Sequence, residues 1–387
     1  METQRPVLEQ PDWITSLVEP DELPRTNEEI GAALRTVAEV AGRLGGLPLA
    51  AATTDHAGKL IAINVDQRLA LHDRSTHAAR VVMVNTLRLL GAGVINLGDI
   101  TLHILSGSNI ESIGQIWLFA PKRVVIHSVD SDQTDPNLVP AHIPVCEDFW
   151  SQAKEVRGIE VSRMPLNENT VQDLAKIEAV VTAQQGSGLN ISTLAKEPYP
   201  RPAWITELGV AFNKVYAPDE LMRLLHVVAK ENVQHGGGPF AAAVVNQVGC
   251  VVELNVNMVV PFRDCGAHAE KVAAANACYL LGQDTLKGCT VYSSSAPCIG
   301  CSEQLTHLCP DCVVSGVPKE RVEAQSGFQE GPVKDGYWKE VEGLYGIKRI
   351  EKFLYDTEQS HADEPFEAFN AAVKKDPSRA YLEKCKD

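Results

Sequence analysis

A chain of 387 residues with 44% hydrophobic and 22% charged residues has enough apolar side chains for two globular domains. Its net charge of −15 argues against a nucleic-acid partner, because proteins that bind polyanions usually carry a basic surface. No apolar run reaches transmembrane length, and the first residues lack the apolar core of a signal peptide. With ten cysteines and no secretion signal, the chain is predicted to be cytoplasmic, where thiols stay reduced.

The chain contains one long internal repeat. Pro11–Leu17 (PDWITSL) returns as Pro202–Leu208 (PAWITEL), 191 residues later. The same offset relates other pairs of segments: 64–66 and 255–257, 77–78 and 268–269, and, after a slip of two residues, 124–125 and 313–314. A period of this length predicts a duplicated domain rather than a solenoid of short repeats.

Each copy is predicted to be a layered α/β unit, because helical stretches alternate with short apolar strands. The helical stretches are Asn27–Leu44 in the first copy and Pro218–Gln234 in the second. We expect the first domain at residues 1–165 and the second at 202–387. Residues 166–201 are predicted to be a partly helical connector that loosens at Gln184–Gly188.

The second copy carries a pattern of metal-binding side chains. His268 and Glu270 open a run of helix formers, and Cys298 and Cys301 follow a short predicted strand. One histidine and two thiolates suit zinc, and three protein ligands leave a fourth position for water. Glu270 would supply the acid/base group that such a water needs. Two helix starts that face one point would also lower the pKa of the thiols.

A closed structural zinc site is the alternative interpretation, with Glu270 exposed to solvent. Such a site needs a fourth protein ligand, for which Cys309 and Cys312 are the obvious candidates. They lie at the far end of the second predicted helix. This pair could also bind a second metal, form a redox pair, or simply belong to a turn between helix and strand.

The first copy lacks these side chains. Ala79 stands at the position of Glu270, and Ser108-Asn109 and Ser112 replace Pro297-Cys298 and Cys301. His77 alone cannot hold zinc, so we expect a catalytically inactive pseudo-domain and one zinc per chain. Its simplest role is to pack against the second copy as an internal pseudo-dimer about a pseudo-twofold axis. A regulatory role of this copy and a homodimer of whole chains both stay open.

The second copy is similar to the cytidine-deaminase-like superfamily, in the branch of guanine deaminases and tRNA adenosine deaminases. H-x-E followed by P-C-x-x-C is the signature of these zinc enzymes. The resemblance covers about Pro218–Gly316, and its landmarks are Gly237–Phe240, Asn257, Asp264, His268–Glu270 and Pro297–Cys301. It implies two tandem three-layer αβα domains, each a mixed five-stranded sheet flanked by helices.

The resemblance also implies residues that bind the substrate. Asn257 corresponds to the family's substrate-orienting asparagine, and Phe240 could stack on a base. Asp264 and Ala269 are expected beside them, although Asp264 also suits a structural turn and Phe240 a place in the core.

Two positions depart from the family pattern. Ala296 precedes the Pro-Cys pair where relatives usually carry a glutamate. In the C-terminal segment, where guanine deaminases use an aspartate to shuttle protons, Glu323 is the candidate replacement. Tyr337-Trp338 could cap the pocket or pack against the domain.

The leading hypothesis is therefore a zinc-dependent aminohydrolase acting on a cyclic amidine. It would deaminate a small aminated heterocycle, a guanine-like base or nucleoside, and release ammonia. Glu270 would take a proton from water and deliver it to a ring nitrogen and then to the leaving amine. One alternative is a tRNA or RNA adenosine deaminase whose inactive half plays the part of a non-catalytic subunit. Another is a non-enzymatic zinc protein that uses the second domain as an interaction module.

Overall fold

The structure is a computed structural model, and it describes residues 10–18, 23–68, 76–90, 97–105, 113–129, 149–166, 174–184, 199–262, 264–328, 331 and 336–376. The chain forms two compact units. The first comprises Pro6–His142 and Glu147–Lys196, and the second is built on Glu197–Asp387. None of the helices in the described ranges is long and apolar enough to span a membrane.

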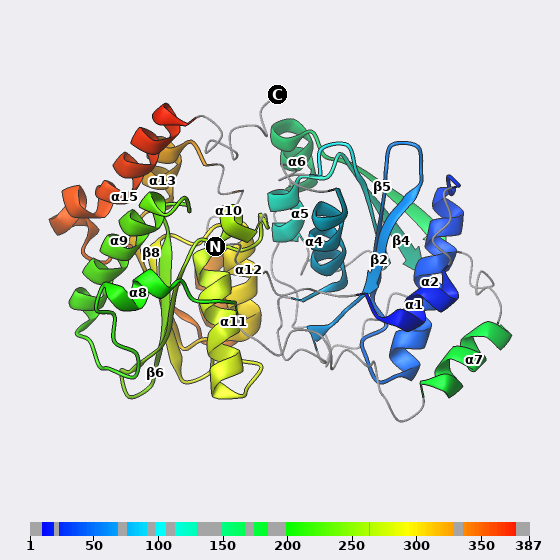
Figure 1. Cartoon of the computed structure of the whole chain (residues 1–387), viewed down its shortest axis with the longest axis horizontal. Coiled ribbons are helices and arrows are strands. Elements are labelled where there is room, and N and C mark those ends of the chain that lie inside the picture. Colours follow the sequence, from blue (N-terminus) through cyan, green and yellow to red (C-terminus); the bar gives the residue numbers. More distant parts are fainter. Residues whose placement is uncertain are drawn as a thin grey trace. The chain divides into compact units, whose positions relative to one another are not determined.

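The described part of the first unit contains a mixed five-stranded sheet between helices. Its elements are α1 (Asp12–Leu17), α2 (Asn27–Arg43), β1 (Ala50–Thr54), β2 (Leu60–Val65), α4 (Ala78–Leu90), β3 (Thr101–Leu105), α5 (Ile113–Phe119), β4 (Arg123–Val129), α6 (Phe149–Arg157), β5 (Glu160–Leu166) and α7 (Leu174–Ala183). The strand order is β2-β1-β3-β4-β5, with β1 antiparallel to both neighbours and the later pairs parallel. Figure 1 shows α4, α5 and α6 on one face of this sheet and α1 and α2 on the other.

The second unit repeats this arrangement and adds helices at its C-terminal end. Its elements are α8 (Ala203–Glu207), α9 (Pro218–Gln234), β6 (Ala241–Asn246), β7 (Val251–Val256), α10 (Val259–Phe262), α11 (Ala269–Leu281), β8 (Cys289–Ser295), α12 (Ile299–Leu308), β9 (Cys312–Val317), α13 (Lys319–Ser326), α14 (Tyr337–Tyr345), β10 (Lys348–Ile350) and α15 (Tyr355–Lys375). The strand order is β7-β6-β8-β9-β10. Helices α11 and α12 cover one face, and α9, α13 and α15 lie on the other (Figure 1). The predicted fold, two mixed five-stranded sheets flanked by helices, is confirmed.

The repeat is visible in the bounds of the elements. Helices α2 and α9 begin and end 191 residues apart, as do β2 and β7, and α4 and α11. Even an irregularity recurs, because the register of β1 and β2 shifts at Thr53/Thr54 and that of β6 and β7 at Val244/Val245. The two sheets therefore share their register as well as their topology.

Helix α7 lies within the stretch predicted as a connector. It packs against α1 and α2, and Ile177 is buried in the core that these helices share with β1 and β2. This helix therefore belongs to the first unit. The predicted loosening at Gln184–Gly188 falls outside the described residues except for Gln184.

Local signals explain where the helices begin and end. Thr26 caps α2 through a capping box, in which its side chain accepts from the Glu29 amide and the Glu29 carboxylate accepts from the Thr26 amide. Helix α9 begins with Pro218, whose missing amide hydrogen costs nothing at this position. Helix α11 ends at Gly282, which takes the left-handed conformation of a C-cap.

The cores of the two units differ at one pair of facing positions, one on a helix and one on a strand. In each unit one of these positions holds a glycine and the other a large residue, but the glycine is on the helix in the first unit and on the strand in the second. In the first unit, a Cβ added to Gly31 on α2 would lie 2.6 Å from Nδ1 of His127 on β4. In the second unit the corresponding residues are Met222 on α9 and Gly316 on β9. A Cβ added to Gly316 would lie 3.1 Å from Sδ of Met222. The large residue is on the strand in one unit and on the helix in the other.

Candidate active site

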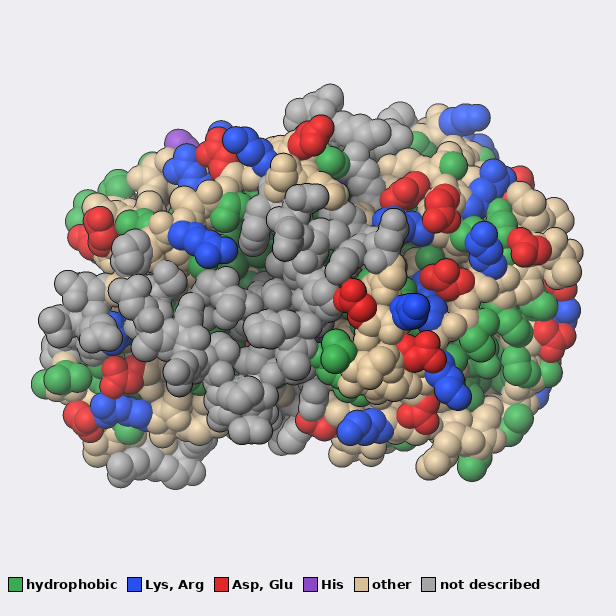
Figure 2. Space-filling model, turned by 180° about the vertical axis from the view of Figure 1, so that it is seen from behind, with side chains coloured by type: hydrophobic (Ala, Val, Ile, Leu, Met, Phe, Trp, Pro, Cys, Tyr) green, Lys and Arg blue, Asp and Glu red, His purple; other side chains and the backbone are tan. Residues whose placement is uncertain are grey.

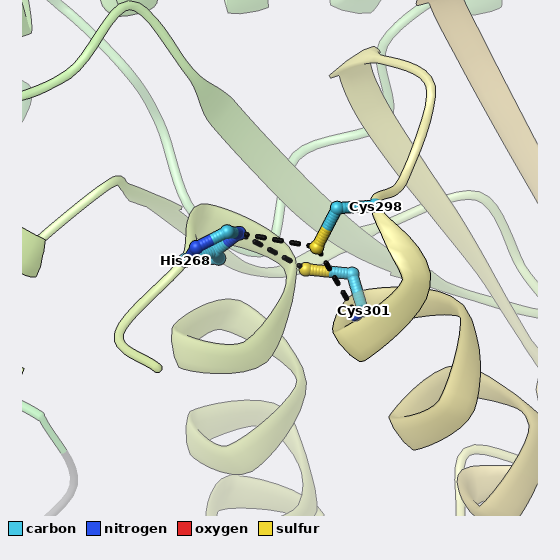
Figure 3. A group of neighbouring side chains, drawn as sticks. All are labelled: His268, Cys298 and Cys301. Atoms are coloured by element: carbon cyan, nitrogen blue, oxygen red, sulfur yellow. Dashed lines mark hydrogen bonds between the residues drawn. The ribbon is translucent and has the colours of Figure 1, made fainter. Parts of the chain in front are cut away.

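His268, Cys298 and Cys301 converge on one point of the second unit. Their ligand atoms all lie within 4.8 Å of one another, and no other group of three or more such side chains gathers in the described residues. Sγ of Cys298 and of Cys301 lie 3.4 and 3.5 Å from His268 Nδ1 (Figure 3). Cys309 and Cys312 are not part of this cluster. Cys309 ends α12 in a left-handed conformation and Cys312 begins β9, so the two flank a turn.

Two helix starts hold the ligands. His268 is the N-cap of α11 and Cys298 is the N-cap of α12, where its Sγ accepts from the Cys301 amide at 3.4 Å. The partial positive charge of both helix ends favours thiolates at this place. Asp264 shapes the loop that leads to His268, because its carboxylate accepts from the Gly266 amide at 2.9 Å. Asp264 thus has the turn role that its sequence context also suggested.

The charges in the cluster favour binding of a cation. The hydrogen bond with Cys301 and the adjacent His268 hold the pKa of Cys298 well below its ordinary value. Burial raises the pKa of Cys301. Two buried thiolates side by side repel each other unless a cation compensates them. One imidazole nitrogen and two thiolate sulfurs are the donors that zinc prefers, so these residues fit a zinc ion.

Glu270 lies beside this cluster on the first turn of α11. Its side chain is buried, and Oε2 is 3.5 Å from Cys301 Sγ. Its other oxygen, Oε1, accepts a hydrogen bond from Ser293 Oγ at 3.1 Å. Burial raises the pKa of Glu270, and a negative charge on Cys298 raises it further. A carboxyl group whose pKa is raised toward neutral can both accept and donate a proton in one reaction cycle.

Asn257 follows β7 and is held through both its side chain and its backbone. Its Oδ1 accepts from the Val259 amide at 3.2 Å, and its backbone carbonyl accepts from Asn232 Nδ2 at 3.0 Å. Asn232 also donates to the Gly238 carbonyl at 2.8 Å. A Cβ on Gly238 would lie 3.0 Å from Asn257 Oδ1, so the glycine leaves room for this amide. Among the described residues, Asn257 Nδ2 donates to no protein acceptor and can serve a ligand.

The structure places Phe240 and Ala269 in packed surroundings. The Phe240 ring lies 5.5 Å from that of Phe328 and 5.7 Å from that of Phe366, within a core that includes α15. Ala269 is the buried first residue of α11 and lies between His268 and Glu270. Neither side chain adds a polar group to the cluster.

The C-terminal candidates lie on helices α13 and α14. Glu323 forms an ion pair with Lys319 at 3.8 Å, and 41% of its side-chain surface is exposed. Tyr337 is buried against α12, where its hydroxyl hydrogen-bonds Thr306 Oγ1 at 2.7 Å. The guanidinium carbon of Arg349 lies over the Trp338 ring, 4.3 Å from the centroid of that ring. Tyr337 and Trp338 therefore make packing contacts.

The sequence analysis did not single out two residues of the site, Asn232 and Ser293. Asn232 stands at the end of an ordinary amphipathic helix, and its contact with Asn257 spans 25 residues. Ser293 is one of three consecutive serines, and only the strand register shows which of them faces Glu270. The one available signal for Ser293 was the internal repeat, which places an isoleucine at its position in the first unit.

Comparison with known proteins locates the similarity in this unit. Residues 216–317 match the family model of the cytidine and deoxycytidylate deaminase zinc-binding region. The guanine deaminase of Bacillus subtilis is 32% identical over 151 residues, which cover 38% of this chain and 92% of that protein. The tRNA-specific adenosine deaminase of Aquifex aeolicus is 36% identical over 77 residues, 20% of this chain and 50% of that protein.

Among solved structures, the guanine deaminase from Nitrosomonas europaea is 26% identical with a TM-score of 0.40, covering 43% of this chain and 94% of that one. The Bacillus subtilis relative is matched over nearly its whole length, and the family model ends at the last strand before α13. The chain therefore belongs to the cytidine and deoxycytidylate deaminase family, in the branch that includes guanine deaminases and tRNA adenosine deaminases.

Proposed function

We propose that this protein is a zinc-dependent hydrolytic deaminase that removes the amino group of a small heterocycle and releases ammonia. The observation that carries the proposal is the position of Glu270, a buried carboxylate 3.5 Å from one sulfur of the His268, Cys298 and Cys301 cluster. A structural zinc site does not require such a group. The similarity to a guanine deaminase over 151 residues makes an aminated purine base the first substrate class to test.

The proposed mechanism assigns separate tasks to the side chains. Zinc held by His268, Cys298 and Cys301 would supply a Lewis acid that makes water a stronger acid. Glu270 accepts a proton at Oε2 and returns it, first to a ring nitrogen and then to the departing amine. Asn257 Nδ2 donates to an acceptor on the ring and so orients the carbon that bears the amino group. The burial of Glu270 keeps bulk water from competing for the transferred proton.

A free base or nucleoside fits this chain better than RNA. The net charge is −15, and on the face in Figure 2 acidic and basic side chains of the described residues are interspersed without a continuous basic surface. RNA binding draws most of its affinity from cationic side chains that contact phosphates. One relative is nevertheless tRNA-specific, so tRNA is a necessary substrate in the test.

The first unit is proposed to be catalytically inactive. Its counterpart of Glu270 is Ala79, buried in the first turn of α4. We further propose that it packs against the second unit. A fragment of residues 202–387 should then self-associate, as measured by sedimentation, through the surface that it uncovers. A monomeric fragment with full activity would indicate a regulatory or substrate-delivery role for the first unit instead.

The compartment is proposed to be the cytoplasm. All eight cysteines in the described residues are free thiols. Metal binding by the cluster requires reduced sulfur at Cys298 and Cys301 and a neutral imidazole at His268. Both conditions hold in a reducing compartment near neutral pH.

A substrate panel tests the proposed activity. The full-length protein, loaded with zinc, is incubated with guanine, adenine, cytosine, their nucleosides, related amino-heterocycles and unmodified tRNA, and ammonia is measured. Release of ammonia from a free base or nucleoside, abolished by a chelator and restored by zinc, is the expected result. Deamination of tRNA alone would replace the proposal with the RNA-editing alternative. No ammonia from any substrate at one bound zinc would favour a non-enzymatic zinc protein.

A further inference from the structure

Ser293 makes a direct contact with the proposed acid/base group. Its hydroxyl donates to Oε1 of Glu270 at 3.1 Å, and both side chains are buried. Ser293 lies on β8, the central strand of the sheet, between Ala242 on β6 and Ser315 on β9. Ladders on both sides fix the backbone, and serine has a single side-chain torsion before its hydroxyl. The position of this oxygen therefore depends on one torsion and on its hydrogen bond to Glu270.

The end of β8 is fixed by neighbouring contacts as well. The Ser294 hydroxyl accepts from the Ala241 amide at 3.1 Å, and its carbonyl is 3.2 Å from His226 Nε2. These contacts lie on α9's side of the sheet, opposite to Glu270. The strand therefore cannot rotate to bring a different serine under α11 without losing them.

The first unit shows what the fold itself requires at this position. Ala51 pairs there with Asn64 on one side and Ile104 on the other, and Ile104 pairs with Ile126. The matching row in the second unit is Asn255, Ala242, Ser293 and Ser315. The alanines and the asparagines are the same in both rows, whereas the two serines replace two isoleucines.

The unit that has a glutamate at the start of the helix has a serine on the strand, and the unit that lacks the glutamate has an isoleucine there. Where the helix above carries Ala79, the strand below carries Ile104, and where it carries Glu270, the strand carries Ser293. A sheet of the same topology and register thus folds with an apolar side chain at this position. The hydroxyl of Ser293 is not a requirement of the fold.

We propose that Ser293 is a positioning residue that holds one oxygen of Glu270 and leaves the other for proton transfer. This inference rests on the proposed function, in which Glu270 moves protons. The contact between Ser293 Oγ and Oε1 is 3.1 Å long, and that between Cys301 Sγ and Oε2 is 3.5 Å long. Ser293 therefore holds Oε1, and the cluster lies beside Oε2.

The contact has a directional consequence. Binding Oε1 to a fixed hydroxyl sets the rotation of the carboxylate, so Oε2 is directed to the side of the cluster. Without that hydroxyl, the carboxylate can rotate and approach the reacting atoms with either oxygen. Fewer molecules then have Glu270 in the reactive orientation, which lowers kcat more than it changes substrate affinity.

The chain offers a matched control at Ser315. It lies beside Ser293 in the same row and on the same face of the sheet, and it is equally buried. Its hydroxyl has no hydrogen-bond partner among the described residues. Ser315→Ala therefore removes the same atom from the same environment without removing a contact to Glu270.

The test compares Ser293→Ala, Ser293→Thr and Ser315→Ala in the full-length, zinc-loaded protein. A hydrogen bond to a charged group contributes enough that Ser293→Ala should lower kcat about 10- to 100-fold. KM should stay within about threefold and bound zinc should be unchanged. Ser293→Thr keeps the hydroxyl and should recover most of the loss, and Ser315→Ala should behave like the wild type. Wild-type kcat in Ser293→Ala, equal losses in both alanine variants, or no recovery with threonine would overturn the inference.

A second measurement does not depend on activity. In a double-mutant cycle, Ser293→Ala should lower the thermal midpoint of the wild-type protein but not that of Glu270→Ala, since the contact is already absent there. Equal shifts in both backgrounds would show that Ser293 does not act through Glu270. This cycle separates the two proposals: a protein without deaminase activity would refute the proposed function, while the cycle would still decide whether Ser293 holds Glu270.

Discussion

The starts of α4 and α11 occupy the same place in two sheets of one topology, yet their chemistry is opposite. At α11, Glu270 and a histidine–cysteine cluster lie over a strand that carries Ser293. At α4, the matching positions hold Ala79 and Ile104, both buried and apolar. The first unit keeps the register, and even the shift at Thr53/Thr54, without these groups. The comparison teaches that the scaffold does not need its metal site in order to fold.

Loss of one thiolate is the most severe test of whether the fold is independent of the metal site. Cys298→Ser should abolish zinc binding and activity together, since two protein ligands do not hold the ion. The protein should remain folded, with a circular dichroism spectrum like that of the wild type. Metal analysis should give one zinc per wild-type chain and none in the variant. Any zinc that survives Cys298→Ser would reveal a second site and contradict the assignment of an inactive first unit.

Removal of the carboxylate should cost activity without costing metal. Glu270→Ala should lower kcat by about 10²- to 10⁴-fold, because the same group serves several proton transfers. Bound zinc should stay at the wild-type level. Ala79→Glu is the matched change in the first unit, and it should add no activity. A Glu270→Ala enzyme within a few-fold of the wild type would mean that another group carries the proton.

The comparison extends to the loop after the second strand of each sheet. Asn257→Asp keeps the oxygen that accepts from the Val259 amide and removes the Nδ2 donor. The loss of a hydrogen bond to substrate should lower kcat/KM by about 10- to 100-fold. The corresponding residue in the first unit is Asp66, which pairs with Arg68 at 3.0 Å. Asp66→Asn should leave kcat/KM unchanged; an equal loss there would point to a structural effect at both places.

Acidification should destabilise the first unit through two buried histidines, and this is the smallest of the expected effects. Burial lowers the pKa of His103 to about 3 and that of its hydrogen-bonded neighbour His127 to about 4. Both are near 6.5 in an unfolded chain. As the pH falls below about 6.5, the unfolded state binds protons that the folded state does not, so stability decreases by about 1.4 kcal/mol per pH unit per histidine. This loss continues until the pH reaches the folded values.

In the second unit, burial lowers the pKa of His226 to about 4. Thermal unfolding of the first unit between about pH 6.5 and 4.5 should show a loss of stability to which His103 and His127 both contribute. His127→Gln, which does not titrate, should reduce that slope by about half. An unchanged slope would mean that these histidines do not control the acid sensitivity of the first unit.

The sequence predicted those helices and strands whose caps and hydrophobic periodicity lie within the segment itself. Helix α9 spans Pro218–Gln234 as expected, and α11 ends at Gly282, because caps and periodicity lie within the segment itself. The cluster of one histidine and two cysteines was also predictable, since H-x-E and P-C-x-x-C each mark a helix start. Ser293 was not, because a shift of one residue in the register would turn its hydroxyl to the other face. Packing of Phe240 against α15 depends on contacts more than 100 residues apart, for which the chain gives no local sign.

Two units of the same topology can misfold when a helix of one unit docks on the sheet of the other. The difference in side-chain size between their two cores disfavours this. If α9 docked on the first sheet, Met222 would meet His127, whose Nδ1 lies 2.6 Å from where a Cβ on Gly31 would stand. This mismatch is a steric clash, and overpacking of this kind destabilises a core. The first sheet therefore disfavours the helix of the other half. The same mismatch would select against an unequal crossover that joined a helix from one half of the gene to the strands of the other.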